Sequence, residues 1–214
     1  MARIVPPAIE EYATQHSTSE NDLLARINRE TYLKVLQPHM LSGPLQGAFL
    51  RMMVRLLKPG RILELGTYTG YATLCMAQAM PEGARLITID KNEELKDQVE
   101  EYLASASLTH AVEYHIGRAE QIIDSLDGSF DLVFIDADKA SNLVYYQKII
   151  DRVNTGGLII ADNVLWKGRV LEKESDAKGH TRNIQEFNAY VASDSRVETV
   201  MLPLRDGLLL ACKL

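Results

Sequence analysis

The sequence contains little cysteine and tryptophan and no long apolar run. Two cysteines and one tryptophan occur among 214 residues. Cys75 stands in an apolar helical context and Cys212 in a terminal strand, so we expect two buried, reduced thiols. The apolar stretches span only a few residues, far below the roughly 18 that a membrane-spanning helix needs. Pro6 and Pro7 interrupt the apolar patch near the N-terminus, which argues against a secretory signal and favours a cytoplasmic location.

Positive charge is also in short supply. Lys and Arg number 23 against 29 Asp and Glu, the formal net charge is -6, and the two signs are interspersed. A nucleic-acid-binding surface needs a basic face, so we expect no nucleic-acid partner. The shortness of the apolar stretches predicts that the membrane is not a partner either. With 46% hydrophobic residues, the chain can bury one core but is short for two. We predict a single domain over 1–214, with an N-terminal helical extension over 1–58.

Short strand-like runs alternate with helical patterns from Arg61 onward. Before them, helical spacing covers residues 20–36 and 42–57. The expected strands are 61–65, 85–90, 111–116, 130–136, 157–161, 197–202 and 207–213, and the expected helices among them are 71–79, 93–107, 119–126, 145–153 and one after the polar loop 172–179. Strand–helix alternation predicts an α/β fold with a parallel, doubly wound, Rossmann-like sheet. Only PLRD links the last two strands, which makes the final strand of this seven-stranded sheet antiparallel.

The turn after the first expected strand carries two glycines in the sequence ELGTYTGY, residues 64–71. Glycines permit a tight turn and close approach of a ligand to the backbone. In an open parallel sheet, ligands bind beyond the carboxyl ends of the strands where the winding direction reverses, here between the first and fourth strands. The G-x-x-x-G spacing differs from the dinucleotide pattern G-x-G-x-x-G, and no Walker-type sequence occurs.

Asp90 closes the second expected strand about twenty residues beyond this turn, where a carboxylate can accept hydrogen bonds from two ribose hydroxyls. Together with the turn, Asp90 favours a nucleoside ligand without a pyrophosphate. Taken singly, Glu64 can pair locally, Gly66 and Gly70 can serve only a turn, and Asp90 can be an ordinary strand-end residue.

Acidic residues also follow the fourth and fifth expected strands, which right-handed connections make neighbours. Asp136, Asp162 and Asn163 offer three hard oxygen ligands, a set suited to Mg²⁺, Mn²⁺ or Ca²⁺. The alternative for Asp162 and Asn163 is a local turn that caps the strand. Lys139 stands three residues after Asp136 and can reach the same cavity, where a nearby cation would favour its neutral amine.

These segments together resemble one known family, the cation-dependent O-methyltransferases, which include catechol O-methyltransferase, caffeoyl-CoA O-methyltransferase and many bacterial relatives. The residues that carry the resemblance are ILELGTYTGYA (62–72), ITID (87–90), FIDADKASN (134–142) and ADNVLWKG (161–168), with MLSGPLQG (40–47) and DGLLLACK (206–213). The resemblance covers nearly the whole chain. It implies a class I methyltransferase fold and S-adenosylmethionine as cofactor.

By this resemblance, Glu64 and Asp90 hold the cofactor and Met40 closes over it. The implied cofactor contacts are Met40, Glu64, Gly66, Thr67, Tyr68, Gly70, Tyr71, Ala72, Asp90, Ala119, Glu120 and Asp136, with Ala119 and Glu120 beside the adenine. Ala72 is a departure, because relatives often place a serine there that contacts the cofactor's carboxylate. Asp136, Asp162 and Asn163 are the implied metal ligands. Lys139 and Asp136 are the implied catalytic residues, with Lys139 as the general base.

The resemblance also implies a small catechol-like or caffeoyl-type substrate, held near Met40, Lys139, Trp166 and Asp206. Two vicinal oxygens of the substrate would chelate the cation, and one would accept the methyl group. The N-terminal helices are more apolar than a cofactor cover needs, and relatives are commonly dimers, so we expect a homodimer. The competing interpretations are a nicotinamide-dependent oxidoreductase, a non-catalytic nucleoside-binding regulatory module and a nucleic-acid methyltransferase, of which the last is disfavoured by the acidic balance.

Overall fold

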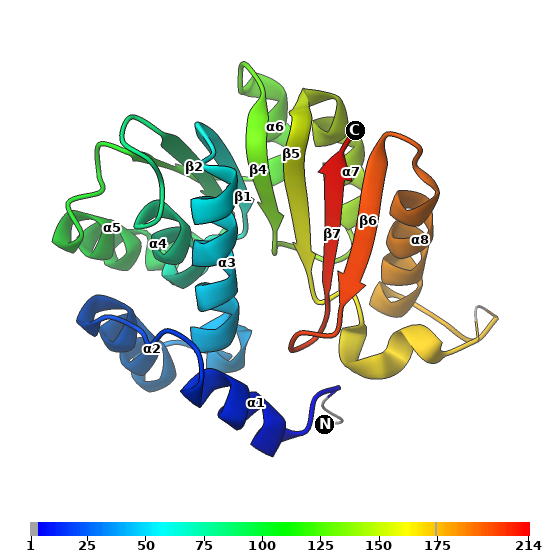
Figure 1. Cartoon of the computed structure of the whole chain (residues 1–214), viewed down its shortest axis with the longest axis horizontal. Coiled ribbons are helices and arrows are strands. Elements are labelled where there is room, and N and C mark those ends of the chain that lie inside the picture. Colours follow the sequence, from blue (N-terminus) through cyan, green and yellow to red (C-terminus); the bar gives the residue numbers. More distant parts are fainter. Residues whose placement is uncertain (1–3, 174) are drawn as a thin grey trace.

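A seven-stranded sheet forms the centre of the molecule, with the strand order β3-β2-β1-β4-β5-β7-β6 (Figure 1). The computed structural model describes residues 4–173 and 175–214. The strands are β1 (Arg61–Leu65), β2 (Arg85–Asp90), β3 (Val112–Ile116), β4 (Phe130–Ile135), β5 (Val153–Asp162), β6 (Val197–Leu202) and β7 (Leu208–Lys213). β1 to β5 pair in parallel, whereas β7 lies antiparallel between β5 and β6. The predicted fold class is therefore confirmed, including the reversal of winding between β1 and β4.

Helices cover both faces of this sheet. They are α1 (Pro7–Gln15), α2 (Asp22–Lys34), α3 (Gly43–Leu57), α4 (Tyr71–Ala77), α5 (Lys96–Ser105), α6 (Ala119–Ser125), α7 (Asn142–Ile149) and α8 (His180–Ser193), with 3-10 turns η1 (Pro38–Met40), η2 (Glu93–Leu95), η3 (Ile150–Arg152) and η4 (Trp166–Leu171). The Asn21 side chain accepts a hydrogen bond from the Leu24 amide at 3.0 Å and so caps α2. Among the described residues, no helix combines the length and the apolar character needed to cross a membrane.

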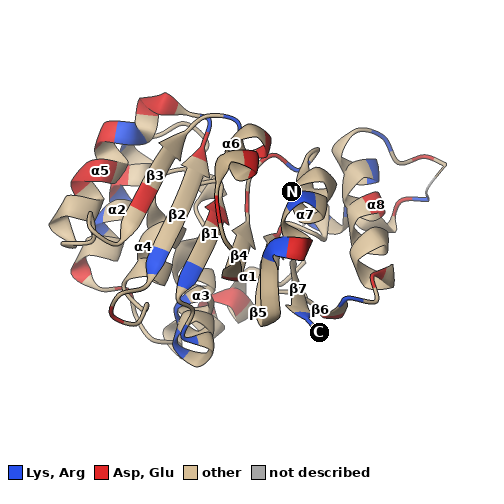
Figure 2. Ribbon diagram, turned by 90° about the horizontal axis from the view of Figure 1, so that it is seen from above, with Lys and Arg blue, Asp and Glu red and all other residues tan. Residues whose placement is uncertain are grey.

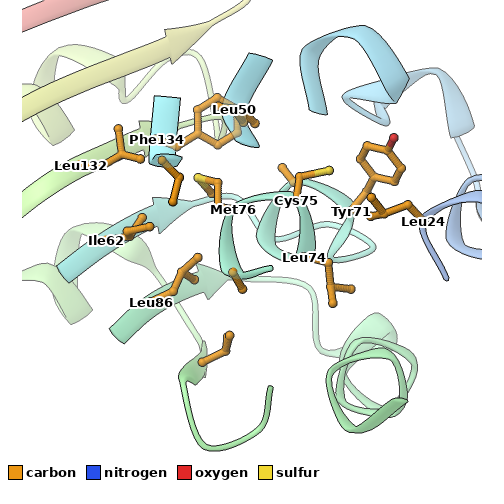
Figure 3. Packing of buried hydrophobic residues seen from close by; sticks show 14 of the residues in the cluster. Leu24, Leu50, Ile62, Tyr71, Leu74, Cys75, Met76, Leu86, Leu132 and Phe134 are labelled. Carbon is orange, nitrogen blue, oxygen red and sulfur yellow. The ribbon is translucent and has the colours of Figure 1, made fainter. Parts of the chain in front are cut away.

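The alternation of side chains along each strand divides the core into two clusters. Ile62 of β1 belongs to one cluster, to which α2, α3 and α4 contribute Leu24, Leu50 and Leu74 (Figure 3). Leu63, the next residue of β1, faces the other cluster, which α6, α7 and α8 supply. Since both faces are covered by helices, the parallel strands are apolar on both sides, and only their ends remain for polar groups.

Several local expectations need correction. The helix α1 was not expected, because two prolines and scattered polar residues hide its short pattern, and it buries none of its residues. β5 begins at Val153, four positions before the expected strand, and the segment after it contains η4, a 3-10 turn that the sequence analysis did not expect. Cys75 is a buried free cysteine as predicted, but Cys212 is only partly buried, because it lies near the end of the terminal strand.

Acidic and basic residues are interspersed over the elements, as Figure 2 shows from above. This distribution agrees with the mixed charge pattern of the sequence. The polar groups that concern function lie at the carboxyl ends of β1, β2, β4 and β5, which share one edge of the sheet.

Candidate active site

The turn between β1 and α4 brings the end of β1 against the end of β4. Gly66 has φ +101°, and a Cβ at this position would collide with the backbone carbonyl of Asp136. Its amide donates a hydrogen bond to the carbonyl of Ile89 at 2.9 Å. Gly70 closes the turn with φ +77°, and its amide donates to the carbonyl of Thr67 at 2.8 Å. Both predicted glycines are thus required by the backbone, and the close approach between Gly66 and Asp136 joins the proposed cofactor and metal regions.

Asp90 at the end of β2 contacts this same turn. Its Oδ2 accepts a hydrogen bond from the amide of Tyr68 at 2.7 Å, and Oδ1 accepts one from the amide of Asn92 at 2.9 Å. Each carboxylate oxygen can accept a further hydrogen bond. The partly exposed Asp90 side chain can therefore also accept hydrogen bonds from ligand hydroxyl groups.

Glu64, near the end of β1, is completely buried. Its Oε2 accepts hydrogen bonds from the hydroxyls of Thr73 and Thr88, the latter at 2.6 Å, while Oε1 has no hydrogen-bond partner in the described part of the chain. Burial raises the pKa of Glu64 to about 8, although the two threonine hydroxyls oppose this shift. A buried acceptor without a partner is costly, so this position suits a ligand that carries a hydrogen-bond donor or a positive charge.

The other residues of the turn are held by neighbouring elements. The Tyr68 hydroxyl donates to the backbone carbonyls of Leu36 and Gln37 at 3.2 and 3.3 Å. The buried Tyr71 directs its hydroxyl to Glu20, at 2.6 Å, in the segment before α2. This hydrogen bond ties α4 to the N-terminal region, and the expected contact of Tyr71 with the cofactor stays a prediction.

The remaining residues predicted to contact the cofactor differ in exposure. Thr67 is buried and its hydroxyl lies 2.6 Å from that of Thr88. Ala72 is buried at the start of α4, and Ala119 is buried at the start of α6. Glu120 follows Ala119 and pairs with Arg118. Met40 is half exposed in η1.

Asp136 and Asp162 lie side by side at the carboxyl ends of β4 and β5. The parallel register pairs Ile135 with Ala161, the residues immediately before them. Asp136 is anchored by its amide, which donates to the carbonyl of Leu65 at 2.8 Å. The ammonium of Lys139 lies 2.8 Å from Oδ1 of Asp136, and both side chains are largely buried. The structure therefore brings the predicted base and two predicted metal ligands together.

The electrostatic environment of Asp136 reflects these neighbours. Burial raises the pKa of Asp136 above its ordinary value, and the Asp162 carboxylate adds to this effect. The Lys139 ammonium acts in the opposite direction, as does Arg205. Two carboxylates in a shielded place repel each other, and a cation between them would relieve that repulsion.

The donor set fits a hard divalent cation with open positions. In residues 4–173 and 175–214, no three His, Cys, Asp or Glu side chains come together in a group that could hold a metal ion. The predicted set instead consists of two carboxylates, Asp136 and Asp162, and the amide of Asn163. Such oxygen donors suit Mg²⁺, which keeps several water or substrate oxygens in its coordination sphere. The alternative interpretation of Asp162 and Asn163, a local turn that caps the strand, also has support. Oδ1 of Asp162 accepts a hydrogen bond from the backbone amide of Asn163 at 2.6 Å.

Trp166 and Asp206 lie in two segments that hold each other near the end of β5. The amide of Leu165 donates to the carbonyl of Asp206 at 2.9 Å, and the amide of Lys167 donates to the Asp206 carboxylate. The Trp166 ring contacts His180 edge to face, with 5.8 Å between ring centroids. Burial raises the pKa of Asp206 above its ordinary value. Trp166 and Asp206 thus both lie near the carboxyl end of β5, and their role in an acceptor pocket stays a prediction.

Sequence reasoning missed Gln46 and Arg205. The Gln46 amide nitrogen donates to Oδ2 of Asp162 at 2.8 Å, and its oxygen accepts from Arg205 at 3.2 Å. A signal for Gln46 was present, because it shares the buried face of α3 with Leu50 and Val54 at helical spacing. A buried polar side chain on an apolar face needs a partner. Arg205 lies in the short PLRD link and had no comparable signal.

The strand order, the glycine turn after β1 and the acidic residue at the end of β2 define a class I methyltransferase fold. The sequence profile of the family described as O-methyltransferase matches residues 14–214. The chain therefore belongs to the O-methyltransferase family, enzymes that transfer a methyl group from S-adenosylmethionine to an oxygen atom.

Individual relatives agree with this assignment. Caffeoyl-CoA O-methyltransferase 1 of Nicotiana tabacum is 34% identical over 182 residues, which span 80% of this chain and 76% of the tobacco enzyme. The crystal structure of a putative O-methyltransferase from Klebsiella pneumoniae has a TM-score of 0.88 and 30% identity, with 96% of each chain covered. The structure of the O-methyltransferase TomG from Streptomyces achromogenes, in complex with SAM, has a TM-score of 0.87 and 28% identity, again with 96% of each chain covered.

Proposed function

We propose that this enzyme methylates one hydroxyl of a small catechol-like or caffeoyl-type substrate and needs a divalent cation to do so. The observation that carries the proposal is the arrangement of Asp136, Lys139 and Asp162 at the ends of β4 and β5, with Lys139 at 2.8 Å from Asp136. The two neighbouring carboxylates repel each other in this shielded place, and a bound cation would offset that repulsion. The relatedness to caffeoyl-CoA O-methyltransferases supports the substrate class.

The cofactor would lie across the ends of β1 and β2. Asp90 would accept hydrogen bonds from the ribose hydroxyls, and the open lone pairs of its carboxylate support this role. The unpartnered Oε1 of Glu64 would face a donor group of the cofactor. Ala119 and Glu120 would border the adenine, and Met40 would cover the ligand from the N-terminal extension, residues 1–58. Thr67, Tyr68, Tyr71 and Ala72 would complete the pocket with Gly66 and Gly70.

Asp136, Asp162 and Asn163 would hold the cation, Mg²⁺ or alternatively Mn²⁺ or Ca²⁺. A bound cation would supply Lewis acidity toward the catechol oxygens. Lys139 would accept the proton of the hydroxyl that becomes methylated, and Asp136 would orient the amine through their hydrogen bond. Trp166 and Asp206 would bound the acceptor pocket and exclude water, since methyl transfer needs alignment and no covalent enzyme intermediate.

The test is transfer of labelled methyl from S-adenosylmethionine to a caffeoyl-type catechol, with Mg²⁺ and with a chelator. We expect transfer with Mg²⁺ and its loss after chelation and in Asp162→Ala. Asp124→Ala is the matched control, because Asp124 is an exposed carboxylate that pairs with Lys148 on the surface. Undiminished transfer after thorough chelation would refute the metal, whereas cofactor binding without transfer would point to another acceptor.

We further propose that the chain acts as a homodimer in the cytoplasm. The N-terminal extension supports the dimer, since exposed apolar residues occur on several of its elements. These are Ile9, Tyr12, Tyr32, Leu33, Leu36, Met40, Met52 and Leu56. Exposed large apolar side chains that gather on one face mark an interface, and we propose that these side chains are buried in the dimer.

A further inference from the structure

The segment formed by residues 36–42, here called the strap, connects α2 to α3 and is fastened at two places. Near its start, the Tyr68 hydroxyl of the glycine turn donates to the carbonyls of Leu36 and Gln37. Near its end, the Arg205 guanidinium donates to the carbonyl of Leu41 at 2.8 Å and to that of Ser42. The strap is therefore bonded both to the glycine turn after β1 and to the short segment between β6 and β7.

Arg205 also contacts the residue that orients Asp162. Its guanidinium donates to the side-chain oxygen of Gln46 at 3.2 Å, and the Gln46 nitrogen donates to Oδ2 of Asp162 at 2.8 Å. Gln46 and Asp162 are buried. An amide whose oxygen accepts from Arg205 must present its nitrogen to the carboxylate, so Arg205 fixes the orientation of the Gln46 side chain.

The backbone conformation of Arg205 is itself unfavourable, so the contacts of its side chain must offset that cost. Its φ is +51°, in the left-handed region that favours glycine. A bulky residue persists there only when its surroundings over-determine the conformation. Here the surroundings are the two carbonyls of the strap and the Gln46 amide.

We propose that Arg205 is a positioning residue that holds the strap over the cofactor and, through Gln46, holds Asp162 in the orientation that binds the cation. The inference rests on the proposed function for the role of Asp162. Groups that hydrogen-bond a metal ligand set its orientation, and their loss weakens metal binding. One guanidinium makes two sets of contacts. Its hydrogen bonds to the strap are here called the strap branch, and its hydrogen bond to Gln46, which orients Asp162, is called the Gln46 branch.

The test measures two affinities in the full chain. Calorimetry gives the affinity for S-adenosylhomocysteine without metal, and electron paramagnetic resonance gives that for Mn²⁺ with S-adenosylhomocysteine present. In Arg205→Gly we expect both to weaken about tenfold, a factor typical of a lost charged hydrogen bond or of a lost partner of a metal ligand. In Gln46→Met only the Mn²⁺ affinity should fall, since the strap keeps its contacts with Arg205.

Lys58→Gly is the matched control. Lys58 is exposed at the C-terminal end of α3, has φ +48°, and lies toward the amino edge of the sheet, away from the site. The Lys58→Gly variant also loses one positive charge, and it also places glycine at a position with a left-handed backbone conformation. Arg205→Lys, which keeps the charge but not the forked donor, should show an intermediate loss and guards against a misfolded glycine variant.

Affinities in Arg205→Gly equal to those of Lys58→Gly would overturn the proposal. So would a lower melting temperature with both affinities unchanged, because that pattern belongs to a purely structural contact. If the unchanged protein binds S-adenosylhomocysteine but no Mn²⁺, the proposed metal site fails and the Gln46 branch is overturned with it. In that case, the affinity of Arg205→Gly for S-adenosylhomocysteine, compared with that of Lys58→Gly, still tests whether Arg205 holds the strap over the cofactor.

Discussion

The ammonium of Lys139 lies 2.8 Å from Oδ1 of Asp136, three positions earlier in the chain. Both side chains are largely buried, and Asp162 on the neighbouring strand adds a second carboxylate close by. A buried pair of this kind restricts the lysine to one place beside the expected acceptor oxygen. The pair therefore provides the most direct test of the proposed chemistry.

Replacing Lys139 with methionine should lower kcat about 10²- to 10⁴-fold, the usual contribution of a positioned general base. The affinity for S-adenosylhomocysteine should change little, since Lys139 lies on the acceptor side. Steady-state kinetics and calorimetry measure the two quantities. Lys148→Met is the control, because Lys148 pairs with Asp124 at the surface. A kcat within threefold of the unchanged enzyme would remove Lys139 from the mechanism.

Replacing Asp90 with alanine should weaken S-adenosylhomocysteine binding at least about tenfold. The variant loses a carboxylate that accepts from the Tyr68 and Asn92 amides and that we expect to accept from ribose hydroxyls, and charged hydrogen bonds contribute about 1.5–3 kcal/mol each. Calorimetry checks this result. Asp97→Ala, at an exposed position in α5, should bind normally. Equal affinities of the two variants would contradict the assigned cofactor site.

The protonation of Glu64 predicts a pH dependence of stability. Its pKa is about 8 in the folded chain against an ordinary 4.5, so its protonated form stabilises the fold fully below pH 4.5 and this contribution is lost as the pH rises through 8. Glu64→Gln imitates the protonated form at every pH. The variant and the unchanged protein should have similar free energies of unfolding at pH 5.

Above pH 8, Glu64→Gln should be the more stable protein by an amount on the order of 3–5 kcal/mol, because one pKa unit corresponds to about 1.4 kcal/mol. Urea unfolding between pH 5 and 9 measures the difference. Glu113→Gln, which alters an exposed carboxylate, serves as control. Parallel curves for Glu64→Gln and the unchanged protein would show that Glu64 does not titrate in this range.

Replacing Gly66 with alanine should destabilise the fold by at least about 3 kcal/mol, because the added Cβ meets the backbone of Asp136, which cannot move aside cheaply. Gly83→Ala is the matched control. Gly83 has φ +80° and open space around it, so only the left-handed conformation is penalised, by about 1–2 kcal/mol. Urea unfolding of both variants measures the two losses of free energy of unfolding. Equal losses in Gly66→Ala and Gly83→Ala would contradict the close approach at Gly66.

Light scattering of the purified protein should give a mass twice the 24.0 kDa of one chain. The physical reason is the exposed apolar surface of the N-terminal extension, which association would bury. The same measurement on Met52→Glu should give a lower mass if α3 takes part in the interface. A mass of one chain for the unchanged protein would contradict the homodimer.

The sequence alone determined the fold class and the position of most polar groups. Strand patterns such as RILEL and RLITID are dictated by burial on two faces, and a parallel sheet places the residues after each strand at one edge. Asp90, Asp136 and Asp162 therefore could be assigned to that edge from the order of the elements. Gly66 and Gly70 could be recognised because a tight turn needs their backbone freedom.

The tertiary structure alone decided which side chains hold these groups in place. Gln46 meets Asp162 across 116 positions, and Arg205 meets Leu41 across 164, whereas local patterns report only on neighbours along a helix or strand. The hydroxyl of Tyr71 in α4 donates to Glu20 in the segment before α2, a contact between distant parts of the chain that no residue spacing reveals. Periodicity encodes burial, and burial determines the sheet; the hydrogen bonds that orient the site depend on how distant segments meet once the core has packed.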